Sequence, residues 1–473
     1  MRASLIGMSA LLMTTTSLNA LSVSADESLV VDVKQRQALG ITIYNQNLAL
    51  VRDARLLPRL PPRKNVSIQD VSRQLQPETL RIKNAGTVLE QNFNARLLSR
   101  QALLEYYLNK DVQLARLNPA TGEETIDKVR LLSLDGNQVL VSRNQQVESI
   151  PLNAQWRFIF PTRPPQLLTQ PSLSFRSQGT AAEQSAQISY LTGGLSWKMD
   201  YVLNLNKAGN SASLSGMATL SNQSGTRYPD AEVQLMAGLV QSPRPVRQYK
   251  SSPAEVMSVM ADARSVAPAQ MEAFHLYNLP EKVDMETGQQ KQIALISSDK
   301  LNIERSYHHS FYVNAHQDSQ KHRLKPNLHL SFKNNKKDGL GQPMPAGNIR
   351  VFRPDNKDII QFVGGAQIGH KSANDPIQVV LGQAFDISIE RRQTQFNKNF
   401  NGHLVAQEIR ISNSREQAAT VILSARFSHP WTLKNSSFPM EKLNSGAAQW
   451  AIKVPGKSDQ LLNFSVQLKT KKK

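Results

Sequence analysis

The most informative absence in this 473-residue sequence is cysteine, which does not occur. The chain can therefore form no disulfide bond and cannot carry a lipid on a lipoprotein cysteine, so its stability must come from packing. Long hydrophobic runs are missing as well. Beyond the first 25 residues, no stretch approaches the roughly 18 consecutive apolar residues that indicate a membrane-spanning helix. We therefore expect a chain without a transmembrane span.

Short motifs of catalysis are also missing. The sequence contains no P-loop, no dinucleotide-binding glycine fingerprint and no H-E-x-x-H pattern. Residues 193–197 (GGLSW) begin like a nucleophile elbow but lack its closing glycine. We therefore expect no cofactor and a binding role rather than catalysis, although the lack of short motifs does not exclude an enzyme.

The first 25 residues have the pattern of a secretory signal. Arg2 gives a positive start, residues 5–13 form a short apolar stretch, and residues 23–25 (VSA) provide small side chains for a cleavage site. We predict cleavage after Ala25, with cleavage after Ala20 as the alternative. The mature protein is then periplasmic or secreted, and it is not a lipoprotein.

Positive charge is in excess, with 56 Lys and Arg against 37 Asp and Glu and a net charge of +19. Dispersed basic residues attract anionic polymers and lipid head groups through their long-range field. Basic groups such as residues 321–325 lack the interleaved aromatic side chains of grooves for single-stranded nucleic acid. Because the chain is expected to be exported, we predict another envelope protein or an anionic envelope polymer as partner, and no nucleic acid.

Strand patterns dominate the remaining sequence. Short runs of alternating apolar and polar residues recur between Gly, Asn and Ser turns, which is typical of β-sandwiches. Residues 99–108 (SRQALLEYYL) form the clearest helical pattern, with Ser99 as its N-cap. The fold class that we predict is mainly β: a multidomain, immunoglobulin-like β-sandwich chain with a small SH3-like barrel insert and one short helix.

A chain of this length exceeds one hydrophobic core, so about two to four domains are expected. Residues 241–270 are rich in Pro, Ser and Ala without a sustained period, which predicts a flexible loop. The expected parts are a signal peptide (1–25), an N-terminal β-rich module (26–98), a short helix with a small barrel-like meander (99–165), a β-sandwich that contains the flexible loop (172–325) and a C-terminal β-sandwich (326–473).

Several stretches, taken in chain order, resemble a bacterial family defined only as a domain of unknown function and described as similar to mucoidy inhibitor A. They are residues 189–203 (SYLTGGLSWKMDYVL), 274–280 (FHLYNLP), 339–352 (GLGQPMPAGNIRVF) and 381–396 (LGQAFDISIERRQTQF). The resemblance covers residues 41–468 and implies an exported, β-rich protein without established catalytic residues, cofactors or substrates. Relatives often carry a long coiled coil that this chain lacks, so no function of that coil is carried over.

Histidines form the one compositional cluster that could carry chemistry. Five of the nine lie between residues 308 and 329, namely His308, His309, His316, His322 and His329. We name His308, His309 and His316 as candidate metal ligands, although none of the spacings matches an established zinc motif. The alternatives are exposed strand and loop histidines or a patch whose charge depends on pH.

The sequence therefore predicts an exported envelope protein that acts as a non-catalytic binding or scaffolding protein through β-sandwich surfaces. One alternative is an envelope hydrolase or metal-dependent enzyme that uses the histidine-rich stretch 308–329. Another is binding of carbohydrate or a cell-wall polymer, which needs exposed aromatic platforms. Trp197, Trp431 and Trp450 are expected instead in the sandwich cores.

Overall fold

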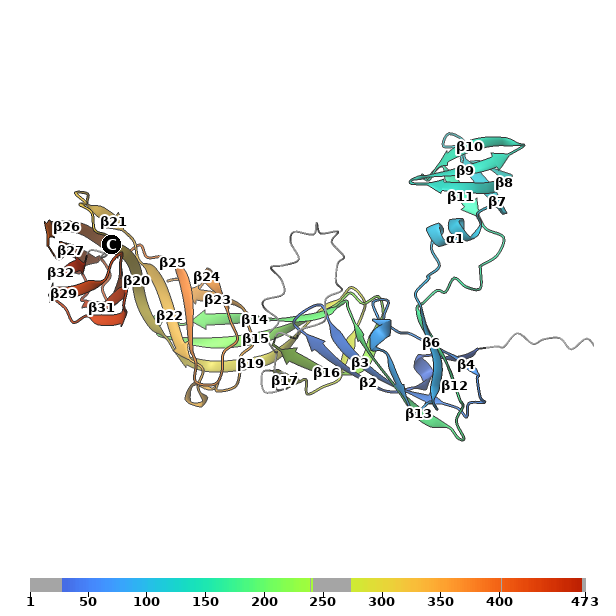
Figure 1. The fold of residues 1–473 in the computed structure, drawn as a ribbon, viewed down its shortest axis with the longest axis horizontal. Coiled ribbons are helices and arrows are strands. Elements are labelled where there is room, and N and C mark those ends of the chain that lie inside the picture. The colour runs from blue at the N-terminus through green and yellow to red at the C-terminus, as the bar shows by residue number, and fades with distance from the viewer. Residues whose placement is uncertain (1–27, 239, 241–273, 401, 470–473) are drawn as a thin grey trace, which may run out of the picture. The chain divides into compact units, whose positions relative to one another are not determined.

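The computed structural model describes residues 28–238, 240, 274–400 and 402–469. β-Strands dominate these residues and one α-helix accompanies them (Figure 1), which confirms the prediction of a mainly β, multidomain sandwich chain. Within the described ranges, no helix is long and apolar enough to cross a membrane. The predicted signal peptide with its cleavage after Ala25 and the predicted flexible loop 241–270 lie outside the described residues.

The chain divides into two compact units. The first contains the described residues up to Ala38 together with Asp53–Arg73 and Pro77–Ser189, and the second contains Leu39–Arg52, Gln74–Gln76 and the described residues from Tyr190 onward. Each unit consists of segments that are separated in the sequence, so no single position in the sequence divides the two units. The predicted domain boundaries stay predictions.

The first unit contains a four-stranded sheet. Its strands are, in spatial order, β1 (Leu29–Val31), β4 (Asn65–Gln69), β12 (Ser172–Ser177) and β6 (Val88–Asn94). Short 3-10 helices η1 (Val33–Gln35) and η2 (Pro77–Thr79) lie between strands. Alternate side chains such as Val66, Ile68 and Phe175 are buried, as expected when one face of a sheet packs on a core.

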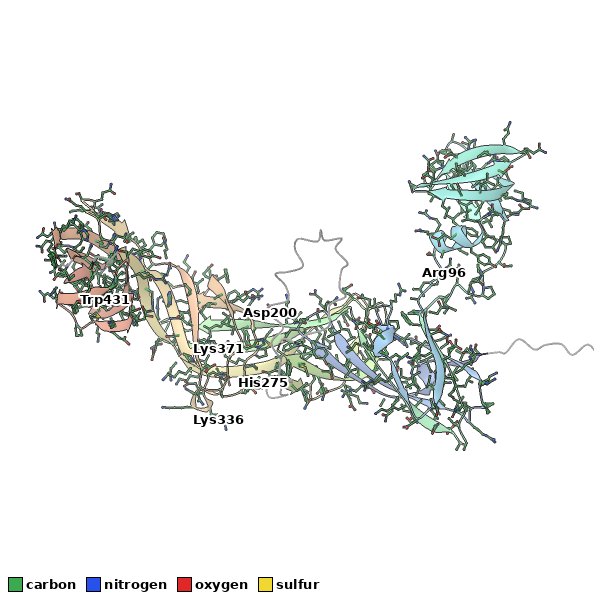
Figure 2. All side chains as sticks on the ribbon, viewed as in Figure 1. Arg96, Asp200, His275, Lys336, Lys371 and Trp431 are labelled. Carbon is green, nitrogen blue, oxygen red and sulfur yellow. The ribbon has the colours of Figure 1, made fainter. Side chains whose placement is uncertain are left out.

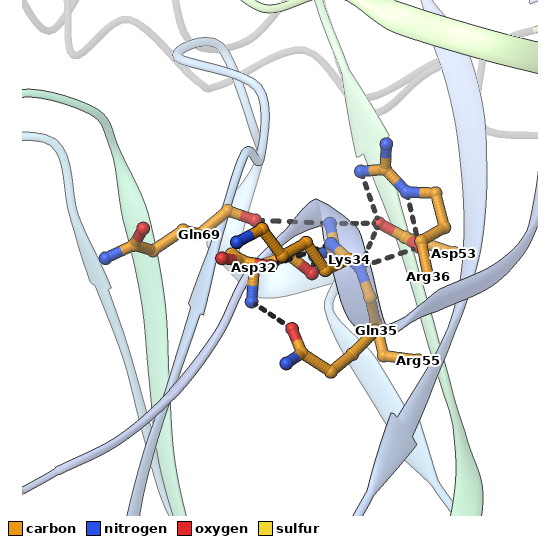
Figure 3. A network of polar contacts seen from close by, with 7 residues as sticks. All are labelled: Asp32, Lys34, Gln35, Arg36, Asp53, Arg55 and Gln69. Atoms are coloured by element: carbon orange, nitrogen blue, oxygen red, sulfur yellow. Dashed lines mark hydrogen bonds and ion pairs between the residues drawn. The ribbon is translucent and has the colours of Figure 1, made fainter.

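A buried ion network supports this unit (Figure 3). The Asp53 carboxylate accepts hydrogen bonds from Arg55 Nη2 at 2.8 Å and from Arg36 Nη2 at 3.0 Å. Arg55 Nη2 also donates to the Gln69 carbonyl at 3.2 Å, and Arg55 Nη1 donates to the Asp32 carbonyl. The Asp53 and Arg55 side chains are only 2 % and 0 % exposed, so one carboxylate neutralises two guanidinium groups inside the protein.

The helix and the small meander form the inserted part of the first unit. Helix α1 (Arg100–Tyr106) begins at Ser99, whose hydroxyl accepts a hydrogen bond from the Ala102 amide at 3.1 Å, which confirms the predicted cap. The strands are β10 (Gln146–Pro151), β9 (Gln138–Arg143), β8 (Glu124–Asp135), β7 (Asp111–Leu117) and β11 (Trp156–Ile159), in spatial order.

This inserted sheet corrects one expectation. Leu104 and Tyr107 from the helical segment pack with Val129 and Val141 in one small core. The sheet has β10 and β11 as its two edges among the described strands, so it is an open antiparallel sheet and not the closed SH3-like barrel that the turn spacing suggested. Turn signals set the number of strands, whereas closure depends on pairing between the first and last strand.

A seven-stranded sheet combines strands from distant parts of the chain. Its path is β17 (His275–Asn278), β16 (Tyr228–Ala237), β2 (Arg36–Tyr44), β3 (Ala49–Leu57), β13 (Gln184–Thr192) and β5 (Arg81–Lys83), and β18 (Val283–Met285) also pairs with β16. Strands β2 and β3 are neighbours in this sheet and flank the turn at residues 45–47.

The second unit contains a five-stranded sheet with one parallel pair at its centre. Its order is β19 (Gln290–Asn302), β15 (Ser211–Asn222), β14 (Leu195–Leu205), β23 (Gly347–Pro354) and β24 (Ile360–Ile368). Strands β14 and β23 are parallel. The Asp200 carboxylate of β14 (Figure 2) accepts from Arg350 Nη1 of β23 at 3.0 Å and from the Thr219 hydroxyl at 3.1 Å.

Two further sheets of the second unit form the C-terminal sandwich. One sheet has the order β25 (Pro376–Gln383), β22 (Asn327–Lys333), β20 (Glu304–Val313), β28 (Ala419–Phe427), β31 (Ala447–Val454) and β30 (Glu441–Asn444). The other has the order β21 (His322–Leu324), β26 (Ile387–Asn399), β27 (Gly402–Asn413), β32 (Ser458–Lys469) and β29 (Trp431–Ser436). A short 3-10 helix, η4 (Lys336–Asp338), follows β22.

Aromatic side chains fill the core between these two sheets. The Trp450 and Phe464 ring centroids are 4.6 Å apart, and Phe311 lies 6.3 Å from Phe464. Trp450 is 1 % exposed, and Trp197 on β14 of the five-stranded sheet is 2 % exposed. Both tryptophans therefore have the core role that the sequence predicts.

Candidate anion-binding site

A cavity of about 290 Å³ in the second unit collects three arginine side chains. Arg305 comes from β20, Arg353 from β23, and Arg415 from the turn between β27 and β28. Each of the three is partly buried. The three positions lie far apart in the sequence, and Arg305 and Arg353 belong to different sheets, so tertiary packing brings them to one place.

The alternation of β20 directs Arg305 and Tyr307 to the same face of their sheet. Register pairs Arg305 with Leu330 and Tyr307 with Leu328 on the neighbouring strand β22. Leu330 is fully buried. The guanidinium of Arg305 therefore lies over a floor of leucine side chains that also line the cavity.

A tight turn between β14 and β15 holds two of the arginines. Arg353 Nη2 donates a hydrogen bond to the Lys207 carbonyl at 2.5 Å. Gly209 has a φ of +72°, and a Cβ atom added there would lie 2.7 Å from Nη1 of Arg305. Glycine therefore suits this position for two reasons: the turn needs a positive φ, and a side chain would clash with the Arg305 guanidinium.

Tyr307 and Asn413 hold the third arginine. Arg415 Nη1 donates to the Tyr307 hydroxyl at 2.6 Å, and the Arg415 backbone amide donates to Asn413 Oδ1 at 3.0 Å. Tyr307 is 3 % exposed and Asn413 is buried as well, so both partners are fixed by the sandwich core. The guanidinium of Arg415 is thus positioned without a carboxylate.

The electrostatics of the cavity are unbalanced. None of the three arginines forms an ion pair with a described carboxylate, and their lining contains one acidic side chain, the exposed Asp386. Within the described part of the chain, the Nε atoms of Arg305 and Arg353 are buried without a hydrogen-bond partner. Burial, together with the positive charges of Arg415 and Arg353, lowers the pKa of Arg305.

Such an arrangement suits an anion. A guanidinium presents its N–H donors in a planar fork that matches a carboxylate or a phosphate group. An anion in the cavity would accept hydrogen bonds from guanidinium N–H groups that line it and would relieve the repulsion among the like charges. The cavity can therefore bind an anionic group.

The structure separates the three candidate metal ligands. His308 and His309 are neighbours on β20, so their side chains point to opposite faces of the sheet. His316 follows the strand, and its carbonyl accepts a hydrogen bond from Gln393 Nε2 at 3.1 Å. Among the residues that the structure describes, no group of three or more His, Asp or Glu side chains could hold a metal ion.

His308 meets a different histidine instead. Its ring stacks on His329 of β22 with the centroids 3.9 Å apart and the planes 12° from parallel, and Ser306 Oγ lies 2.8 Å from His308 Nε2. Burial and the neighbouring His329 lower the pKa of His308 to about 4, so this ring is neutral at pH 7. Burial, followed by the charge of Arg391, also lowers the pKa of His309.

The remaining tryptophan of the carbohydrate alternative is not an open platform. Trp431 on β29 (Figure 2) stacks on Phe427 with the ring centroids 4.2 Å apart, and Lys442 Nζ lies 5.5 Å from the Trp431 ring centroid. Its side chain is partly buried. These contacts give the Trp431 ring a packing role.

Comparison with known proteins does not assign the chain to a family. No protein-family model matches the sequence, and a search of curated proteins finds no significant match. The functional argument therefore depends on the arginine cavity itself. The sequence offered no local signal for this cavity, because its three arginines come from separate strands and turns.

Proposed function

We propose that this chain is an exported, non-catalytic binding protein of the cell envelope that holds an anionic group of its partner in the arginine cavity. The observation that carries this proposal is the convergence of Arg305, Arg353 and Arg415 on one cavity without a paired carboxylate among the described residues.

The three guanidinium groups around one cavity repel one another. An anion of the partner relieves this repulsion, and hydrogen bonds to charged groups contribute about 1.5 to 3 kcal/mol each. The net charge of +19 accelerates the approach of an anion at low ionic strength.

The lining favours binding over catalysis. The described residues around the cavity include no histidine, serine or lysine, and the one carboxylate among them, Asp386, is exposed to solvent. The Tyr307 hydroxyl accepts a hydrogen bond from Arg415, which fixes this arginine in place. The arginines can neutralise and orient an anion, which fits a receptor for a carboxylate- or phosphate-bearing molecule.

Calorimetric titration of the purified chain with phosphate and with acetate, at low ionic strength, tests the proposal. We expect at least one anion to bind and Arg353→Gln to weaken it about tenfold or more, because one charge-assisted hydrogen-bond donor is lost. Arg426→Gln is the matched control, since Arg426 is exposed on β28 and removes the same charge outside the cavity. Absence of binding, or equal effects of the two variants, would refute the proposal.

A further inference from the structure

We infer that the ligand of the cavity is an amphiphile, a molecule that carries a carboxylate or phosphate close to an apolar chain or ring. The anionic head lies among the arginines, and the apolar part covers leucine, valine and phenylalanine side chains of the same cavity. This inference rests on the proposed function, which by itself requires only an anion. It adds the chemical class of the molecule that carries the anion.

Leucine side chains form much of the apolar lining of the cavity. Leu328 and Leu330 of β22, Leu381 of β25 and Leu205 at the end of β14 line the same cavity as the three guanidinium groups. Leu328 is only partly buried, so it leaves apolar surface open beside the partly buried arginine side chains. A bare hydrated anion gains nothing from a leucine surface, while an apolar group next to the anion is stabilised by covering it.

A β-bulge in β24 adds to this apolar lining. Phe352 pairs with Phe362 and Val351 pairs with Gly364, so Val363 is an extra residue without a partner on β23. A bulge changes the direction of a side chain relative to regular alternation. Here the bulged residue lines the cavity, and 37 % of its surface is exposed. The bulge therefore adds an apolar side chain to the wall.

Phe385, which also lines the cavity, presents its ring to solvent. Its side chain is 91 % exposed although the backbone on both sides is held. The Ala384 amide donates to the Pro326 carbonyl at 2.8 Å, and Lys325 Nζ donates to the Phe385 carbonyl at 2.7 Å. A fixed loop that presents a phenylalanine ring to water beside three arginines offers an apolar surface for the ligand to cover.

The size of the cavity fits a small head group with a few carbons. Its volume of about 290 Å³ lies at the lower end of the range for ligand pockets, roughly 300 to 1,000 Å³. A longer chain would leave the cavity past Phe385 and Val363. The same chemistry occurs in free amphiphiles and in phospholipid head groups, and the experiment separates these sources.

The test compares inorganic phosphate with hexyl phosphate, kept below its micelle concentration, by calorimetry on the whole chain. We expect hexyl phosphate to bind more tightly, by about fourfold for each methylene that becomes buried. Phe385→Ser should reduce the advantage of hexyl phosphate over inorganic phosphate. Phe400→Ser is the matched control, because Phe400 is fully exposed and lies outside the cavity.

A flotation assay identifies the source of the amphiphile. If the head group belongs to a lipid, vesicles of phosphatidylcholine with phosphatidic acid should bind the chain. Arg353→Gln and Phe385→Ser should then each abolish the binding to these vesicles. Binding of hexyl phosphate without binding of these vesicles supports a free amphiphile instead.

The anion site and the amphiphilic nature of its ligand can be refuted separately. Hexyl phosphate that binds no better than inorganic phosphate, or Phe385→Ser without effect on its affinity, overturns the amphiphile and leaves the anion site standing. Vesicle binding that neither variant reduces reports only the general basic charge and counts against the inference. Failure of all probes to bind overturns the proposed function together with this inference.

Discussion

The buried carboxylate of Asp53 gives the sharpest test of the packing argument. Asp53→Asn keeps the size of the side chain but removes its charge and replaces one acceptor oxygen with a donor amide. The guanidinium groups of Arg55 and Arg36, whose side chains are 0 % and 8 % exposed, then lose their counter-charge (Figure 3). The variant therefore leaves two buried cations with only neutral acceptors.

The magnitude follows from this geometry. Removing one partner of a buried ion pair typically costs about 3 to 5 kcal/mol, because the remaining charge stays buried. The carbonyls of Gln69 and Asp32 still accept hydrogen bonds from Arg55, so we expect the lower part of this range. Replacing Arg55 as well, in Asp53→Asn/Arg55→Met, should recover part of the loss, since one of the two uncompensated charges is removed.

Hydrogen exchange followed by mass spectrometry is the suitable assay, because a chain with two compact units need not unfold in one step. Amides of β3 and β4 should exchange more than about a hundredfold faster in Asp53→Asn, which corresponds to about 3 kcal/mol. Asp111→Asn is the control, since its ion pairs with Arg130 and Lys128 are exposed, and it should leave these amides unchanged. Equal exchange in Asp53→Asn and the parent chain would refute the reasoning.

Three further predictions concern other parts of the chain. Burial and the neighbouring His329 lower the pKa of His308 to about 4, so its contribution to stability is complete above pH 6.5 and is lost as the pH falls toward 4. Urea titrations at several pH values should show that His308→Gln removes this part of the pH dependence, by on the order of 1 to 2 kcal/mol. Gly194→Ala should destabilise the second unit by about 2 to 4 kcal/mol, because φ is +80° and the new Cβ would lie 2.5 Å from Ser224 Cα; an unchanged urea midpoint would contradict this. Ser99→Ala should cost about 0.5 to 2 kcal/mol and speed the exchange of α1 amides alone.

Local patterns in the sequence predict the local structure well. Alternating runs correspond to strands, and Ser99 caps the one described α-helix. These features depend on a few neighbouring residues, so sequence spacing is sufficient to find them. The mainly β class follows directly.

Long-range pairing is what the sequence does not reveal. The parallel pairing of β14 with β23 joins Tyr201 to Ile349, and no turn between them signals this partnership. Packing between two different sheets likewise brings Arg353 of β23 close to Arg305 of β20. Nearness along a strand does not bring side chains together either, since His308 and His309 point to opposite faces of their sheet.

The central claim is that an anion binds between the arginine side chains. Crystals grown with selenate, whose selenium atom scatters anomalously, would locate the anion directly. The account predicts an anomalous peak within hydrogen-bonding distance of Arg305 and Arg353, and its loss in crystals of Arg353→Gln. Selenate bound elsewhere on the basic surface while this cavity stays empty would contradict the account.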